Sequence, residues 1–163
     1  MNLKTFVPGF LKKENSDDLT VRTSNFNLVA RRSGLLKKLR RLTLHSGSGM
    51  NHELDNLLHV AQQRPVEAKV LLAYQDSSLV GWAILSREDS GFYFPNTDEP
   101  FSASQGALFE VYVDPKHRRK GVGTKLIETA KKKCGTHTLC LCPWDSNSRN
   151  FFKNFKKYNP REL

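Results

Sequence analysis

Two glycines and three basic residues lie within a short stretch of the chain, Arg118-Arg-Lys-Gly-Val-Gly-Thr124. A strand-like segment precedes this stretch and an amphipathic helical segment follows it. Glycine lets backbone N–H groups approach an anion closely, and the first turn of a helix presents unpaired N–H donors with a partial positive charge. The three basic side chains add full positive charges at the same place. The residue types and their spacing therefore predict a cradle for a phosphate or a pyrophosphate.

Two common phosphate-binding motifs do not fit the same stretch. A Walker loop requires a glycine at the position of Arg118 and a lysine directly after Gly123, where the chain has Thr124. A dinucleotide-binding fingerprint requires a third glycine at the position of Leu126. Both of these nucleotide-binding classes are therefore excluded.

The elements that must position the cradle follow from the periodicity of the apolar residues. Alternation predicts strands, and spacing of three and four residues predicts helices. The expected strands are residues 18–23, 69–74, 79–85, 107–113 and 138–142. The expected helices are residues 24–42 with Ser24 as the cap, 54–61 ending before Pro65, 121–133 and 148–158. This order, β-α-α-β-β-β-α-β-α, predicts an α+β fold with a mostly antiparallel sheet packed by helices. The long connection 86–106 is expected to be functional or to carry an extra strand.

Length and composition favour one ordinary domain. The chain has 163 residues, of which 38% are hydrophobic and 26% charged. We expect residues 1–17 to be an N-terminal extension and residues 18–163 to be a single domain. No apolar run is long enough to span a bilayer, and residues 1–13 lack the apolar core of a secretory signal. The expectation is a cytoplasmic protein with no membrane contact.

The three cysteines, Cys134, Cys140 and Cys142, cannot all pair within one chain. Their spacing is not that of a zinc site, and no fourth ligand is evident. We interpret them as small buried apolar residues in a reducing compartment.

The net charge of +10 is unevenly distributed. Residues 1–50 carry a net charge of +7, residues 51–110 carry −6 and residues 111–163 carry +9. Residues 31–41 contain six lysines and arginines and no acidic residue. That basic helix is either a solvated surface or a contact for nucleic acid or another acidic partner.

The cradle and its neighbours resemble a motif of the GNAT superfamily, the Gcn5-related N-acetyltransferases. The pyrophosphate loop of that family follows the pattern Arg/Gln-x-x-Gly-x-Gly/Ala, and this chain reads Arg118-Arg-Lys-Gly-Val-Gly123. The preceding strand, Leu108-Phe-Glu-Val-Tyr-Val-Asp-Pro115, and the segment Leu79-Val-Gly-Trp-Ala-Ile-Leu85 are similar to strands of that family. The order of elements matches the family over residues 18–158.

This resemblance implies acetyl-CoA as the acyl donor. It implies two splayed parallel strands, with the pantetheine arm lying along Val111, Tyr112 and Val113 and pairing with the backbone of Val111 and Val113. The residues implied to hold the pyrophosphate are Arg118, Arg119, Lys120, Gly121, Val122, Gly123 and Thr124.

The resemblance also implies catalytic residues. Glu110 is the candidate general base, although a solvated or ion-paired strand carboxylate is an alternative reading. His117 is a second candidate base, but its place in the basic turn favours a surface residue. Phe152 stands where many relatives carry the tyrosine that protonates the departing thiolate. Tyr158 or a water molecule would replace that acid, or the thiolate leaves unassisted.

Residues 159–163 are too few for the two strands that end many relatives, so the acceptor side would be open, completed by residues 86–106, or completed by another subunit. The oligomeric state stays open.

The resulting functional hypothesis is an N-acetyltransferase that acetylates a primary amine of a small molecule or a protein by direct attack. The acidic residues of the middle section, Glu88, Asp89, Asp98 and Glu99, favour a cationic amine such as a polyamine, an aminoglycoside-like compound or lysine. The alternative is a nucleic-acid-associated or nucleic-acid-modifying protein, or a non-catalytic binding module, on the same fold.

Overall fold

The described residues form a five-stranded sheet, with its strands in the spatial order β1-β2-β3-β4-β5. The computed structural model describes residues 18–46, 52–63, 65–86, 105–134, 138–141 and 150–151. The strands are β1 (Thr20–Asn25), β2 (Ala68–Gln75), β3 (Ser78–Ser86), β4 (Gln105–Val113) and β5 (Thr138–Leu141). The helices are α1 (Phe26–Ala30), α2 (Ser33–Ser46), α3 (His52–Gln63), the 3-10 turn η1 (Pro115–His117) and α4 (Val122–Cys134).

Strands β1 to β4 pair antiparallel with their neighbours, and β5 pairs parallel with β4. The expected α+β fold is confirmed. Strand and helix positions agree with the expected ones to within about two residues for most elements, which is the usual uncertainty of element ends.

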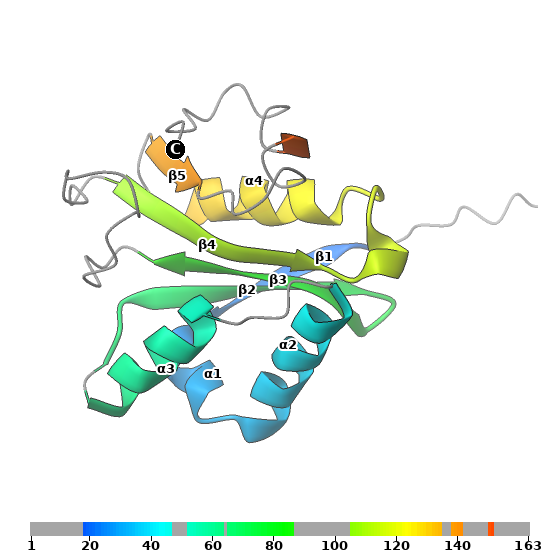
Figure 1. Ribbon diagram of the computed structural model, residues 1–163. Helices are drawn as coiled ribbons and strands as arrows, with labels where there is room; N and C mark the ends of the chain where they lie inside the picture. The colour runs from blue at the N-terminus through cyan, green and yellow to red at the C-terminus, as the bar shows by residue number, and fades with distance from the viewer. Residues whose placement is uncertain are drawn as a thin grey trace, which may run out of the picture.

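Helices cover both faces of the sheet. Helix α4 lies on one face, and α1, α2 and α3 lie on the other (Figure 1). The alternation of side chains along each strand supplies both layers. Leu71 and Ala73 of β2 pack in the core under α4, whereas Val70 and Leu72 pack in the core under α1, α2 and α3.

The expected helix over residues 24–42 is wrong in one respect, because the chain forms two helices, α1 and α2, in this region. Helix α1 ends at Ala30, and the backbone turns at Arg31 and Arg32 before α2 begins. This break changes the direction of the apolar face, so that Leu28 is 52% exposed. The expected cap is also wrong, since Ser24 lies within β1. The side chain of Asn25 caps α1 instead, where its Oδ1 accepts a hydrogen bond from the Asn27 N–H at 2.8 Å.

Several expectations lie outside the described residues. These are the N-terminal extension 1–17, most of the connection 86–106, Cys142, Phe152, Tyr158 and the chain end 159–163. The division into residues 1–17 and 18–163 stays a prediction. Among the described residues, no helix has the length and apolarity to cross a membrane, and no cluster of three or more metal-ligand side chains occurs.

Candidate active site

Strand β4 has a paired edge and an edge that opens along its length. On one side it pairs with β3 from Ala107 to Val113. On the other side it pairs with β5 only from Gln105 to Leu108. Within the described part of the chain, the last five residues of β4 therefore have no strand on their second edge. The structure describes β5 no further than Leu141, so the expected splay between two parallel strands stays a prediction.

Glu110 forms a β-bulge in β4, at the place where the second edge of this strand opens. Ile84 of β3 pairs with Phe109 and Ala83 pairs with Val111, so that Glu110 is an extra residue in β4. Its φ is 43°, a left-handed conformation that is uncommon for a residue with a side chain. The residue is only 8% exposed. Backbone strain of this kind typically costs about 1–3 kcal/mol and clusters at functional sites.

The register decides where the backbone groups after the bulge point. The Asp114 N–H donates to the Val80 carbonyl at 2.9 Å, and Tyr112 lies opposite Trp82. In an antiparallel ladder, residues alternate between bonding to the partner strand and pointing away from it. Val111 and Val113 consequently direct their N–H and C=O groups to the open edge, whereas Tyr112 directs its own toward β3.

The side chains alternate in the same way. Val111 and Val113 pack against the core beneath α4. The ring of Tyr112 lies on the opposite face, with its centroid 5.0 Å from that of Trp82 and the two planes tilted by 32°. Trp82 is completely buried, and its Nε1–H has no hydrogen-bond partner within the described structure.

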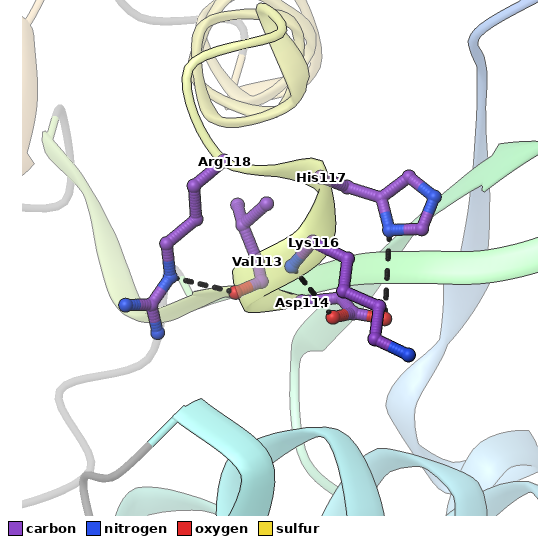
Figure 2. Close-up of polar contacts among 5 residues, drawn as sticks. All are labelled: Val113, Asp114, Lys116, His117 and Arg118. Carbon is purple, nitrogen blue, oxygen red and sulfur yellow. Dashed lines mark hydrogen bonds and ion pairs between the residues drawn. The ribbon is translucent and has the colours of Figure 1, made fainter.

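A tightly bonded turn leads from β4 into the cradle. Asp114 begins η1, where its Oδ1 accepts a hydrogen bond from the Lys116 N–H at 3.0 Å. Its Oδ2 lies 3.5 Å from Nδ1 of His117. Pro115 fits the first position of η1, because its fixed φ suits a helix start. Figure 2 shows His117 and Arg118 on opposite sides of this turn.

Arg118 turns back onto the open edge of β4. Its Nε–H donates to the carbonyl oxygen of Val113 at 3.1 Å (Figure 2). The arginine therefore holds one of the backbone groups that the open edge presents. Its side chain is otherwise exposed, at the entrance of the basic loop.

The loop after Arg118 has a backbone conformation suited to binding an anion. Arg119 and Gly121 have left-handed φ values of 62° and 81°, on either side of Lys120. Alternation of right- and left-handed residues turns successive N–H groups toward one point, which forms an anion-binding nest. No side chain lies within 4 Å of the position of a Cβ on Gly121, so its conformation, and not crowding, favours glycine there.

Helix α4 begins directly after this loop. The first helical hydrogen bond runs from the Lys125 N–H to the Gly121 carbonyl at 2.9 Å. The N–H groups of Val122, Gly123 and Thr124 therefore have no acceptor within the helix. These groups and the helix dipole add to the nest as a site for an anion. A Cβ on Gly123 would lie 2.9 Å from Cζ of Phe151, so the helix start is also tightly covered.

The chain thus brings most of the expected site residues into one continuous path. The path starts at Glu110, follows the open edge at Val111 and Val113, and ends in the loop 118–124. Tyr112 lies on this strand, but its backbone pairs with β3 and its ring lies on the other face. His117 lies beside Asp114, with its Nδ1 3.5 Å from Oδ2 of that residue. Tyr158 is outside the described residues.

Two features of the site were not expected from the sequence. The hydrogen bond between Arg118 and the Val113 carbonyl joins residues five apart, and no motif marks it. The contact of Trp82 with Tyr112 joins neighbouring strands that are far apart in the sequence, and only the pairing register places the two rings together.

A comparison with protein families gives a match over most of the chain. The profile of the acetyltransferase (GNAT) family matches residues 36–156. Among curated protein sequences, none matches the chain significantly.

Solved structures share the fold at low sequence identity. A protein from Desulfovibrio desulfuricans assigned to the GNAT family has a TM-score of 0.60 and 15% identity, over 84% of this chain and 83% of that one. An aminoglycoside acetyltransferase from an uncultured soil metagenomic sample, in complex with sisomicin, has a TM-score of 0.57 and 16% identity over 89% and 90%. A ribosomal-protein-alanine N-acetyltransferase from Brucella melitensis has a TM-score of 0.54 and 18% identity over 89% and 92%. At these identities the structures show a shared fold.

Proposed function

The chain belongs to the acetyltransferase (GNAT) family, whose donor is acetyl-CoA, and on that premise we propose that it acetylates a primary amine of a small molecule or a protein. The observation that carries the proposal is the path from the bulge at Glu110 along the open edge of β4 into the nest at residues 119–121. Acetyl-CoA fits such a path, because it is an extended thioester with a pyrophosphate at its far end. The molecule needs hydrogen-bond partners for the amides along its middle and an anion site at that end.

In this proposal the backbone and the basic loop bind the donor. The outward C=O group of Val111 and the outward N–H and C=O groups of Val113 pair with the pantetheine amides, and the loop 118–124 holds the pyrophosphate. Because Arg118 holds the Val113 carbonyl, the donor either displaces this guanidinium or pairs beside it. A displaced Arg118 becomes available to the pyrophosphate.

Glu110 acts as the general base. Acetyl-CoA supplies an activated acetyl group, and the attacking amine must first lose a proton. The Glu110 carboxylate accepts that proton, and the N–H of Val111, which points to the open edge, is placed to stabilise negative charge on the acyl oxygen. A carbon–nitrogen bond forms and a carbon–sulfur bond breaks, and the leaving thiolate takes a proton from Tyr158 or from water.

The acceptor is proposed only as a primary amine. The solved structures with this fold include an aminoglycoside acetyltransferase and a ribosomal-protein-alanine N-acetyltransferase, so fold alone does not choose between small molecules and proteins. A nucleic-acid partner gains no support from the family or from these structures. The cytoplasmic location stays a prediction.

Two measurements on the same protein test the proposal. Calorimetric titration with acetyl-CoA should give saturable binding that the double variant Arg118→Ala/Gly121→Asp loses. The rate of CoA thiol release with a panel of primary amines should be roughly 10²–10⁴-fold lower in Glu110→Gln, while this variant still binds acetyl-CoA. Glu128→Gln is the matched control, because Glu128 is an exposed carboxylate on α4.

The outcomes separate the parts of the proposal. Absence of acetyl-CoA binding would reject the proposed acetyltransferase activity and favour a non-catalytic binding module. Normal binding with an unchanged rate in Glu110→Gln would retain the enzyme but reject Glu110 as its base.

A further inference from the structure

A groove lies on the face of the sheet opposite α4, away from the path proposed for acetyl-CoA. It has a volume of about 680 Å³ and is bounded by α2, by the turn between β2 and β3, and by η1. None of the residues proposed to bind the donor lines it. We refer to this surface as the basic groove, after the side chains described next.

Three cations from two distant segments line the basic groove. Lys38 and Arg41 come from α2, and Lys116 comes from η1. Figure 2 shows the Lys116 side chain extending from η1 on the side where α2 runs. Asp114 is the one carboxylate of the lining, and its Oδ1 accepts the hydrogen bond from the Lys116 N–H. The lining therefore carries three positive charges against one negative charge, which gives the groove a positive potential.

Apolar side chains lie between these cations. Leu35 and Leu42 of α2 and Leu79 of β3 line the groove and are half-buried. Tyr74 lines it as well, and the guanidinium of Arg22 lies 5.0 Å from the centroid of its ring. The lining thus combines an apolar floor with a cationic margin.

We propose that the basic groove binds an acidic peptide segment of a protein partner. Carboxylates of the segment pair with Lys38 and Lys116, beside Arg41, and an apolar side chain of the segment packs on the three leucines. Exposed apolar surface rimmed by polar residues is typical of protein interaction sites. Charge complementarity then selects an acidic partner and orients it.

The same features argue for a peptide and against nucleic acid. A single strand binds through phosphates along a long basic track and through stacking of bases on aromatic rings. The one aromatic ring of the groove lining is Tyr74, and Arg22 lies over it. The leucines offer no partner to a phosphate. The proposal does not depend on the proposed acetyl transfer, because the donor path and the groove share no residue.

Binding of a defined probe to the full chain tests the proposal. The probe is a fluorescein-labelled eight-residue peptide of alternating glutamate and leucine. Its binding is measured by fluorescence anisotropy. We expect saturable binding that weakens by roughly tenfold or more in Lys38→Glu/Lys116→Glu. The matched control is Lys37→Glu/Lys132→Glu, which changes the net charge equally at exposed positions outside the groove and should stay within about twofold of the wild type.

Two further probes test the chemistry of the occupant. A peptide with serine in place of leucine should bind at least about fivefold more weakly, because it cannot use the apolar floor. A ten-nucleotide oligothymidylate should bind more weakly than the Glu–Leu peptide. The proposal is overturned if the oligonucleotide binds more tightly and is lost in Lys38→Glu/Lys116→Glu. It is also overturned if the control variant loses the peptide equally, or if the wild type does not bind the peptide.

Acetyl-CoA titration of each variant keeps these outcomes distinct from the function of the donor site. A folded Lys38→Glu/Lys116→Glu variant should bind acetyl-CoA as the wild type does. If that variant does not fold, Lys38→Gln/Lys116→Gln replaces it, and we then expect a weakening of roughly three- to tenfold for the peptide.

Discussion

The two faces of the sheet differ in how closely their helices approach the strands. On the α4 face, a Cβ on Gly81 would lie 2.8 Å from the Tyr112 carbonyl oxygen and 3.1 Å from Cγ1 of Val122. On the α2 face, a Cβ on Gly34 would meet nothing within 4 Å, and the basic groove of about 680 Å³ lies beside it. One helix approaches the strand backbone directly, whereas the other leaves a hollow.

The difference separates two ways of making a charged site. The proposed donor site is made largely from backbone groups, in a loop whose shape depends on Gly121 and on the close packing of α4. The basic groove is made from side chains of α2, the β2–β3 hairpin and η1. Backbone sites depend on the conformation of the chain, while side-chain sites depend on charge and tolerate changes of shape. Four substitutions test these two contrasts, the packing of the two faces and the make-up of the two sites.

Gly81→Ala should have the largest effect on stability. Its Cβ would push against a backbone oxygen, which cannot move without shifting β4. We expect a loss of about 3 kcal/mol in the free energy of unfolding, at the upper end for overpacking. Urea denaturation followed by circular dichroism measures it. A loss below about 0.5 kcal/mol would mean that the α4 face is not tightly seated.

Gly121→Val should separate conformation from packing. Space is available for the side chain, but φ of 81° is strained for a β-branched residue, at about 1–2 kcal/mol. The loop should relax away from the nest, and the affinity for acetyl-CoA should fall about tenfold, which corresponds to 1.4 kcal/mol. Calorimetric titration measures the change. Unaltered affinity would show that side-chain charges, and not the backbone nest, dominate donor binding.

Arg40→Ala should have a small effect, because the ion pair that it removes is exposed to solvent. Arg40 of α2 forms an ion pair with Asp55 of α3, and both side chains are about half exposed. An exposed pair of this kind contributes at most about 1 kcal/mol. Urea denaturation at low and high salt should give a difference that salt reduces. A loss as large as that of Gly81→Ala would contradict the contrast between the faces.

Gly34→Ala should have the smallest effect, with the opposite sign. The position is helical and open, so alanine lowers the entropy of the unfolded chain without a clash. The free energy of unfolding should rise by about 0.5 kcal/mol. The same urea series detects it, and a fall in stability would show that the α2 face is more crowded than the groove indicates.

The fold and the turn that leads into α4 could be predicted from the sequence because their signals are local. The cradle is a run of seven residues, and the strands before it carry clear alternation. The break between α1 and α2 was missed because apolar spacing continues across Arg31 and Arg32. The cap was misplaced by one residue because Ser24 and Asn25 are adjacent and both suit a helix start.

The remaining features depend on register and on contacts between distant segments. Glu110 was predicted on the strand before the loop, but neither its burial nor its positive φ follows from its own neighbours. They follow from the pairing of β4 with β3. The basic groove joins residues near 38, 79 and 116, and no single window of the sequence contains all of them. The roles of Glu110, Tyr158 and the loop residues in catalysis and donor binding stay predictions.

The bulge at Glu110 has a consequence for insertions and deletions in β4. Phe109 and Val111 already face consecutive residues of β3, so removal of Glu110 alone would leave every other cross-strand pair in register. Leu108, Val111 and Val113 would keep their packing beneath α4. The fold therefore contains one residue more than the ladder requires. The bulge thus places a carboxylate in the middle of an apolar strand while the cross-strand pairs on both sides of it stay regular.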